Sequence, residues 1–290
     1  MFPISKIVLP VDFSERARQA AAFAVPVAEH FHSEVIVLHA LATQYEFGSV
    51  ELGGAIVTTE FTSGHREQAE KRLAEFLLKE LGNLNVRRLL VEGDPAREIV
   101  ECARREQASL IVIPTHGYGV FRRLLLGSVT AKVLHDADCP VWTTAHVEKP
   151  EPRETVLRRI LCAIDLGPAS ARSLEWSARM AADFGAQLTL VHAIVELDPR
   201  NAGYHFSPEW RKHLVDAAEA EIFALQKRAG TQAGVVIALG SAADMVCAEA
   251  RKADTDLLVI GRGCETGILG RLTADAYAII RQSPCPVVSV

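Results

Sequence analysis

The sequence lacks the features that mark several large classes of protein. None of its six cysteines forms a CxxC pair or stands at a His/Cys spacing typical of zinc, so we expect buried thiols in a reducing compartment. Acidic residues outnumber basic ones by 36 to 31, and a net charge of −5 offers no basic surface for wrapping nucleic acid. Apolar runs such as residues 110–114 fall far short of the roughly 20 residues that a bilayer span needs.

Two further absences bear on location and on chemistry. No apolar leader with a cleavage site precedes the first predicted strand, so we expect a cytoplasmic protein without membrane or nucleic-acid partners. Neither GxxxxGK[ST] nor a complete GxGxxG occurs. Without a Walker lysine or a set of carboxylates that binds Mg²⁺, fast phosphoryl transfer lacks its usual parts. We therefore predict no catalytic residue and no metal site.

The sequence does contain an internal repeat. Similar segments recur at offsets of 146 to 153 positions and place the same residue types in register, among them Asp12 with Asp165, His39 with His192, and Cys139 with Cys285. The chain is therefore predicted to hold two copies of one unit, residues 1–147 and 156–290. A charged, proline-containing linker, residues 148–155, joins them.

Within each copy, short apolar runs alternate with helical patterns. In the first copy Ile7–Val11 is a predicted strand, and the helix after it starts with Ser14 as N-cap and is kinked or ended early by Pro26. A second helix is predicted over Arg66–Leu81, with Gly82 as its stop. Continuous apolar strands separated by helices predict the α/β class: in each copy, a doubly wound, mostly parallel five-stranded sheet of the flavodoxin or Rossmann type.

In such sheets, ligands bind beyond the carboxyl ends of the strands, where the strand order reverses. Asp12 and the loop that begins at Pro114 both follow predicted strands. Gly127 and Ser128 open the helix after that loop, where N–H groups without helical acceptors attract anions. Ser128 can cap this helix or donate to a phosphate, and Asp12 can bind a ribose or base or simply cap its own helix. These residues predict an anion site opposite a polar group and leave the ligand open.

The glycines of this loop follow a spacing found in a known family. Gly117 and Gly127 enclose nine residues and Ser128 follows, and the chain here resembles the universal stress proteins in their tandem two-domain form. The strands before Asp12 and Ala40 are also similar to the opening strands of that family. The resemblance implies that the first copy binds an adenine nucleotide, ATP foremost, with Mg²⁺ as a candidate companion. It assigns the nucleotide to Asp12, Ala40, Pro114, Thr115, His116, Gly117, Gly127, Ser128 and Val129.

Both copies depart from the family pattern. Pro114 stands where the family has its first glycine, which removes an N–H donor and costs a ligand on the order of 1 kcal/mol. In the second copy Thr273-Ala274 replaces the Gly-Ser pair, and Asp275 at the helix start would repel phosphate. We expect at most a weaker second site, made of Asp165, Ala193, Gly261 and Gly263, in which Arg262 or Arg271 binds another anion or fills the site from within.

Three functions remain open at this point. The preferred one is a nucleotide-responsive regulatory or protective protein of the stress response. His116 beside the loop motivates slow ATP hydrolysis, and Pro114 with the altered second loop motivates a nucleotide-independent scaffold. We interpret His39, His192 and His116 more simply, as strand-end histidines whose rings are satisfied by backbone groups.

The resemblance also bears on assembly. It implies that the two copies pack as an internal pseudo-dimer through their last strands, with Pro140–Thr144 and Pro286–Val290 as the candidates. A homodimer of whole chains and the identity of any protein partner are left open by the sequence.

Overall fold

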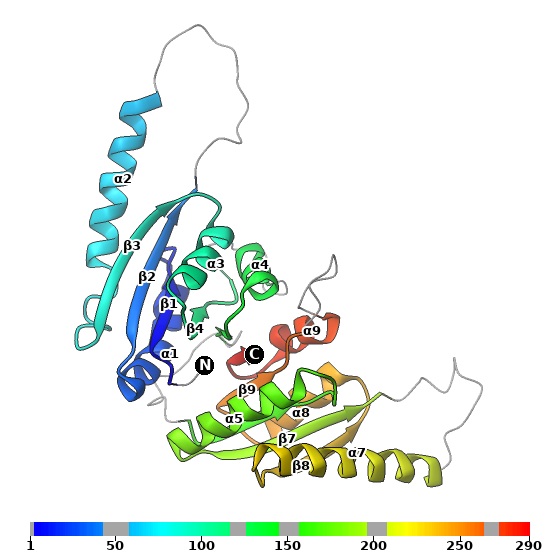
Figure 1. The fold of residues 1–290 in the computed structure, drawn as a ribbon. Coiled ribbons are helices and arrows are strands. Elements are labelled where there is room, and N and C mark those ends of the chain that lie inside the picture. Colours follow the sequence, from blue (N-terminus) through cyan, green and yellow to red (C-terminus); the bar gives the residue numbers. More distant parts are fainter. Residues whose placement is uncertain (1–2, 43–57, 117–125, 145–156, 196–207, 264–272) are drawn as a thin grey trace, which may run out of the picture. The chain divides into compact units, whose positions relative to one another are not determined.

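The computed structural model describes residues 3–42, 58–116, 126–144, 157–195, 208–263 and 273–290, with side chains from Gly64 onward in the helix that begins at 58. The chain forms two compact units, residues 1–141 and 142–290, each of which is a layered α/β structure (Figure 1). The predicted linker 148–155 and the predicted domain ends beside it lie outside the described residues.

Unit 1 alternates strands and helices along the chain. Its strands are β1 Lys6–Pro10, β2 Glu34–Leu41, β3 Asn85–Glu92, β4 Leu110–Ile113 and β5 Val141–Thr143, which starts at the end of the unit. Its helices are α1 Glu15–Phe31, α2 Thr58–Glu75, α3 Pro95–Arg105 and α4 Ser128–Asp136. The strand order is β3-β2-β1-β4-β5, and β1 pairs in parallel with both β2 and β4. The order therefore reverses between β1 and β4.

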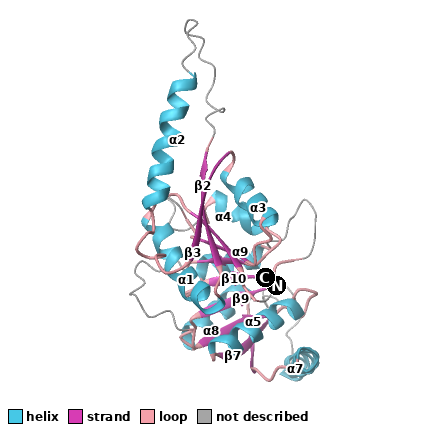
Figure 2. Ribbon diagram, turned by 60° about the vertical axis from the view of Figure 1, so that its left-hand side comes forward, coloured by secondary structure: helices cyan, strands magenta, loops and turns pink. Residues whose placement is uncertain are grey.

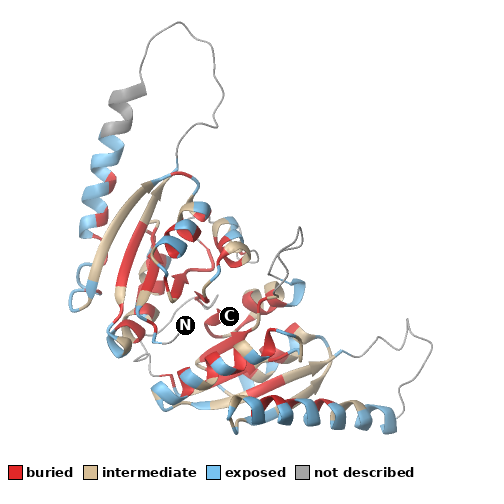
Figure 3. Ribbon diagram, in the orientation of Figure 1, coloured by how far each residue is buried: buried red, intermediate tan, exposed pale blue. Residues whose placement is uncertain are grey.

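Helices cover both faces of this sheet. The helix α1 packs on β1 and β4, α2 packs on β2 and β3, α3 packs on β1 and β2, and α4 packs on α3. Figure 1 shows α3 and α4 on one side of the strands and α2 on the other, and Figure 2 shows the same layers from a second direction. The central strands are the most buried part of the unit (Figure 3). The predicted doubly wound, mostly parallel fold is confirmed.

Unit 2 repeats this topology. Its strands are β6 Arg159–Ala163, β7 Gln187–Ile194, β8 Gly234–Leu239, β9 Leu257–Ile260 and β10 Val287–Ser289. Its helices are α5 Ser170–Phe184, α7 Pro208–Ala229, α8 Ala242–Lys252 and α9 Ala274–Gln282. The order β10-β9-β6-β7-β8 reverses between β6 and β9, the counterparts of β1 and β4. No helix within the described ranges is long and apolar enough to cross a membrane.

Two helices differ from their predicted extents. The helix α1 runs through Pro26 to Phe31, so the predicted early stop is wrong; its buried alanine face packs on the sheet, and this packing outweighs the one backbone bond that proline removes. The helix α2 ends at Glu75 rather than near Gly82, because Leu77 takes a φ of +59°.

Carbonyl groups at the end of α2 accept hydrogen bonds from an arginine of the neighbouring strand. Arg88 on β3 donates from Nε to the carbonyl of Leu73 at 2.9 Å and from Nη2 to that of Phe76 at 3.2 Å. The last carbonyls of a helix have no helical donor, so these bonds replace the one that a further turn would supply.

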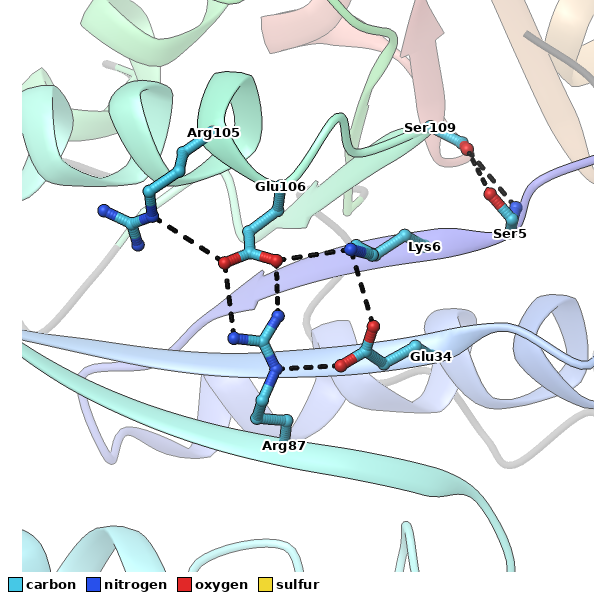
Figure 4. A network of polar contacts seen from close by, with 7 residues as sticks. All are labelled: Ser5, Lys6, Glu34, Arg87, Arg105, Glu106 and Ser109. Carbon is cyan, nitrogen blue, oxygen red and sulfur yellow. Dashed lines mark hydrogen bonds and ion pairs between the residues drawn. The ribbon is translucent and has the colours of Figure 1, made fainter.

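A network of charged side chains closes the amino ends of β1, β2 and β3 (Figure 4). Arg87 donates to Glu34 at 2.8 Å and to Glu106 at 2.5 Å, and Lys6 Nζ lies 3.2 Å from Glu106 Oε2. Hydrogen bonds from Arg87 and then Lys6 lower the pKa of Glu106 to about 2. This network lies at the edge of the sheet opposite the predicted ligand site.

Candidate functional site

The carboxyl ends of β1, β2 and β4 bring the predicted residues of unit 1 to one edge of its sheet. The N–H of Val11 donates to the carbonyl of Leu38 at 2.8 Å; Asp12 is the next residue after Val11, and Ala40 lies two residues after Leu38. The parallel register of β1 and β4, Ile7 with Leu110 and Val8 with Ile111, brings the carboxyl ends of both strands to the same edge. These ends flank the point where the strand order reverses, which is where doubly wound sheets bind ligands. Gly117 lies outside the described residues.

Asp12 holds the turn that joins β1 to α1. Its Oδ1 accepts the Ser14 N–H at 3.0 Å and the Ser14 hydroxyl at 2.5 Å. Ser14 accepts the Ala17 N–H at 3.2 Å, so the predicted N-cap at Ser14 is confirmed, and Asp12 supports the cap instead of forming it. Phe13 has a φ of +63°, which a large side chain rarely adopts, so these bonds hold a strained turn. Because both bonds use Oδ1, Oδ2 is the oxygen suited to accept from a ligand.

Two hydrogen bonds join the start of the loop after β4 to the start of α4. The Gly127 N–H donates to the carbonyl of Thr115, and the Thr130 hydroxyl donates to the carbonyl of Pro114, both at 2.8 Å. A Cβ on Gly127 would lie 3.3 Å from the Thr115 oxygen, so this close approach favours glycine. Thr130 was missed in the sequence, where its place in the first turn of a predicted helix was the one available signal.

The start of α4 offers backbone donors without a side-chain cap. Gly127 is the N-cap residue, and the described structure has no side-chain hydrogen bond at this position. Ser128 is the exposed first residue of the helix, so of its two predicted roles capping is ruled out and donation to a ligand stays a prediction. First-turn N–H groups and the positive end of the helix dipole favour an anion here. Thr115 and His116 are both buried beside this helix start.

Two of the three strand-end histidines contact backbone carbonyls, as predicted. His39 Nδ1 lies 2.7 Å from the carbonyl of Val11, and His192 Nδ1 lies 2.8 Å from that of Ile164, so the backbone interpretation is confirmed for both. His116 instead brings Nδ1 within 3.2 Å of the Thr115 hydroxyl, a side-chain contact.

The cysteines with described surroundings are mostly buried thiols, as predicted. Cys102, Cys162, Cys247 and Cys285 are buried, and burial raises the pKa of Cys162 to about 12. Cys139 is half-buried.

The same edge of unit 2 supplies its own hydrogen-bond partners. Asp165 Oδ1 accepts the Gly167 N–H at 2.8 Å and the Ser170 hydroxyl at 2.9 Å. Thr273 caps α9 by accepting the Ala276 N–H at 3.2 Å, and the first turn carries Asp275. A helix start that is already capped and carries a carboxylate is a poor phosphate site.

Side chains also crowd the strand ends of unit 2. Arg172 on α5 donates from Nη2 to the carbonyl of Val290 at 2.7 Å, and the Arg262 side chain is buried. A Cβ on Gly261 would lie 3.1 Å from both the Ala169 Cβ and the Ser173 Oγ. Ala193 and Gly263 are half-buried nearby along this edge.

The two sheets differ at the strand reversal itself. The strands β1 and β4 pair at two positions and no further than Val8, whereas β6 and β9 pair to their ends, Ala163 with Ile260. The Val11 N–H points to β2, so the alternation of a parallel strand points the nitrogen of Pro10 toward β4. Proline has no N–H to donate, so the hydrogen-bond ladder between β1 and β4 ends earlier than the ladder between β6 and β9.

Comparison with known proteins agrees with the duplicated fold. The sequence model of the universal stress protein family matches residues 3–144 and again residues 157–290. The universal stress protein MJ0531 of Methanocaldococcus jannaschii is 33% identical over 146 residues, which cover 50% of this chain and 83% of that protein. A universal stress protein of Thermus aquaticus is 37% identical over 135 residues, covering 47% of this chain and 94% of that protein.

A solved structure shows the same fold over nearly the whole chain. The crystal structure of a universal stress protein from Archaeoglobus fulgidus matches with a TM-score of 0.73 at 21% identity and covers 99% of this chain and 98% of its own. With the family pattern matched twice, the chain belongs to the universal stress protein family and carries two tandem copies of its domain.

Proposed function

We propose that unit 1 binds an adenine nucleotide, ATP foremost, and that the protein is a nucleotide-responsive regulatory or protective binding protein of a cellular stress response. The observation that carries this proposal is the start of α4, which has no side-chain cap and lies beside the end of β4. Family membership and the loop spacing from Gly117 to Ser128 support the choice of a nucleotide.

The proposed roles follow from the chemistry at each end of the site. First-turn N–H groups of α4, with the Ser128 hydroxyl, bind the phosphates. Asp12, through Oδ2, and the backbone at Ala40 bind the ribose or the base, and Mg²⁺ accompanies the triphosphate. Pro114 contributes its carbonyl to Thr130 and has no N–H for the ligand, so the affinity is lower than with glycine by about 1 kcal/mol.

Isothermal calorimetry with ATP tests this proposal. We expect the native protein to bind ATP and Gly127→Asp to bind none, because the new carboxylate would stand at the helix start and repel the phosphates. Thr273→Asp is the matched control, since it introduces the same charge at the equivalent N-cap of unit 2, where aspartate is also a good cap. Its ATP affinity should equal that of the native protein. Absence of ATP binding by the native protein would contradict the proposed nucleotide site.

A further inference from the structure

Thr130 makes a buried contact that the proposed nucleotide roles do not use. Its side chain is 4% exposed, and its hydroxyl donates to the carbonyl of Pro114 at 2.8 Å. Pro114 is itself buried and follows the last residue of β4, where its carbonyl needs a donor. The Thr130 hydroxyl therefore joins α4 to the end of β4.

This bond is one of a pair that acts on the first turn of α4. The second is the Gly127 N–H, which donates to the carbonyl of Thr115, the residue after Pro114. A single hydrogen bond would let the helix start swing about it. Two bonds set three residues apart on the helix, to adjacent carbonyls, fix both the distance and the tilt of the first turn. The direction of the first-turn N–H groups is fixed with it.

The described residues of unit 2 have no counterpart of the side-chain bond made by Thr130. Counted from the N-cap, Thr130 is the third residue of α4, and the third residue after the N-cap Thr273 is Ala276, which has no hydroxyl. The side-chain bond to the strand end thus belongs to the copy whose helix start is without a side-chain cap.

We infer that Thr130 is a positioning residue for the phosphates: it holds the first-turn N–H groups of α4 at the place and angle that a polyphosphate needs. The inference rests on the proposed nucleotide site in unit 1. Thr130 has no role toward the nucleoside part, because Asp12 follows β1, Ala40 lies near the end of β2, and neither is held by this bond.

The test compares ATP with adenosine on the full chain. Thr130→Val keeps the shape of the side chain and removes the donor, whereas Thr130→Ser keeps the donor. We expect Thr130→Val to weaken ATP by about three- to tenfold, the value of one buried hydrogen bond. Adenosine, measured by its displacement of ATP, should change by less than about twofold, and Thr130→Ser should keep the native ATP affinity within the same margin.

Two further variants separate positioning from folding. Thr130→Cys has a weak donor of similar size and should give an intermediate loss of ATP affinity, and it replaces the valine variant if that one does not fold. Ser177→Ala removes a buried hydroxyl of unit 2, which donates to the Ser173 carbonyl at 2.7 Å, and should leave ATP affinity unchanged.

The outcomes are distinct. Native ATP affinity in Thr130→Val, or equal weakening of ATP and adenosine, overturns the positioning role while the nucleotide site stands. If the native protein binds neither ligand, the proposed function fails and this inference fails with it.

Discussion

The two units share one topology but differ at the carboxyl edge of the sheet, in the length of the central ladder and in the capping of the helix start. In unit 1 the ladder between β1 and β4 ends at Val8, and the described residues give the helix start no side-chain cap. In unit 2 the ladder between β6 and β9 runs to the strand ends, and the helix start is capped. Three matched pairs of positions carry the difference: Pro10 with Ala163, Gly127 with Thr273, and Thr130 with Ala276.

This difference shows how a duplicated fold can divide its roles. A doubly wound sheet brings strand ends and helix starts together at every reversal of strand order, so both copies inherit the place for a site. Whether such an edge binds a ligand depends on which groups accept hydrogen bonds from the N–H groups at its helix start. Unit 2 caps its helix start with the Thr273 side chain, whereas the described residues of unit 1 place no side-chain cap at the start of α4.

The aspartate after the first strand gives the largest expected contrast. Asp12→Ala removes a charged acceptor of the nucleotide, and we expect ATP affinity to fall by about 10- to 100-fold, as for loss of a hydrogen bond to a charged group. Asp165→Ala removes the same kind of turn contact in unit 2 and should leave ATP affinity unchanged. Calorimetry on both variants measures this, and equal losses of ATP affinity would contradict a nucleotide contact made by Asp12 in unit 1 alone.

The length of the hydrogen-bond ladder gives a smaller contrast in stability. Ala163→Pro removes the N–H that points to β9, so we expect the free energy of unfolding to fall by at least about 1 kcal/mol. The reverse change, Pro10→Ala, breaks no backbone bond and should alter stability by less than about 1 kcal/mol. Urea unfolding followed by circular dichroism compares the two. A cost for Pro10→Ala as large as that for Ala163→Pro would contradict the ladder explanation.

Local rules predicted the features whose causes lie close in sequence. Ser14 caps α1 because a serine follows a strand and precedes a helical pattern, and His39 bonds the carbonyl of Val11 because adjacent parallel strands end together. The duplication itself was visible in the repeat of residue types. The extent of α2 was not, because Arg88, distant in sequence, satisfies its last carbonyls and the chain turns at Leu77.

The candidate site was predictable in outline for the same reason. Family resemblance and strand ends pointed to Asp12 and Gly127, which the structure places on one edge of unit 1. The bond from Thr130 to Pro114 joins residues across the loop, and the effect of Pro10 depends on which neighbouring strand its nitrogen faces. Both depend on tertiary pairing, which the local pattern of residues does not encode.

The amino edge of unit 1 provides the smallest contrast, one that depends on pH. The positions of Glu34, Arg87 and Glu106 are held in unit 2 by Gln187, Gly234 and Ala253, which cannot form the charged network. With its pKa lowered to about 2 from a usual value of 4.5, Glu106 stabilises the folded state above about pH 4.5, and this contribution is lost as the pH falls toward 2.

Glu106→Gln tests this contribution directly. At pH 6 we expect its urea midpoint to lie below that of the native protein, by less than the shift caused by Ala163→Pro, because the charges are partly solvated. The gap should narrow between pH 4.5 and 2, since the native protein loses what the variant already lacks. Glu101→Gln, at an exposed glutamate on α3, is the control and should show a smaller gap at pH 6. A gap for Glu106→Gln that stays constant down to pH 2 would show that packing of the side chain, not its charge, stabilises this edge.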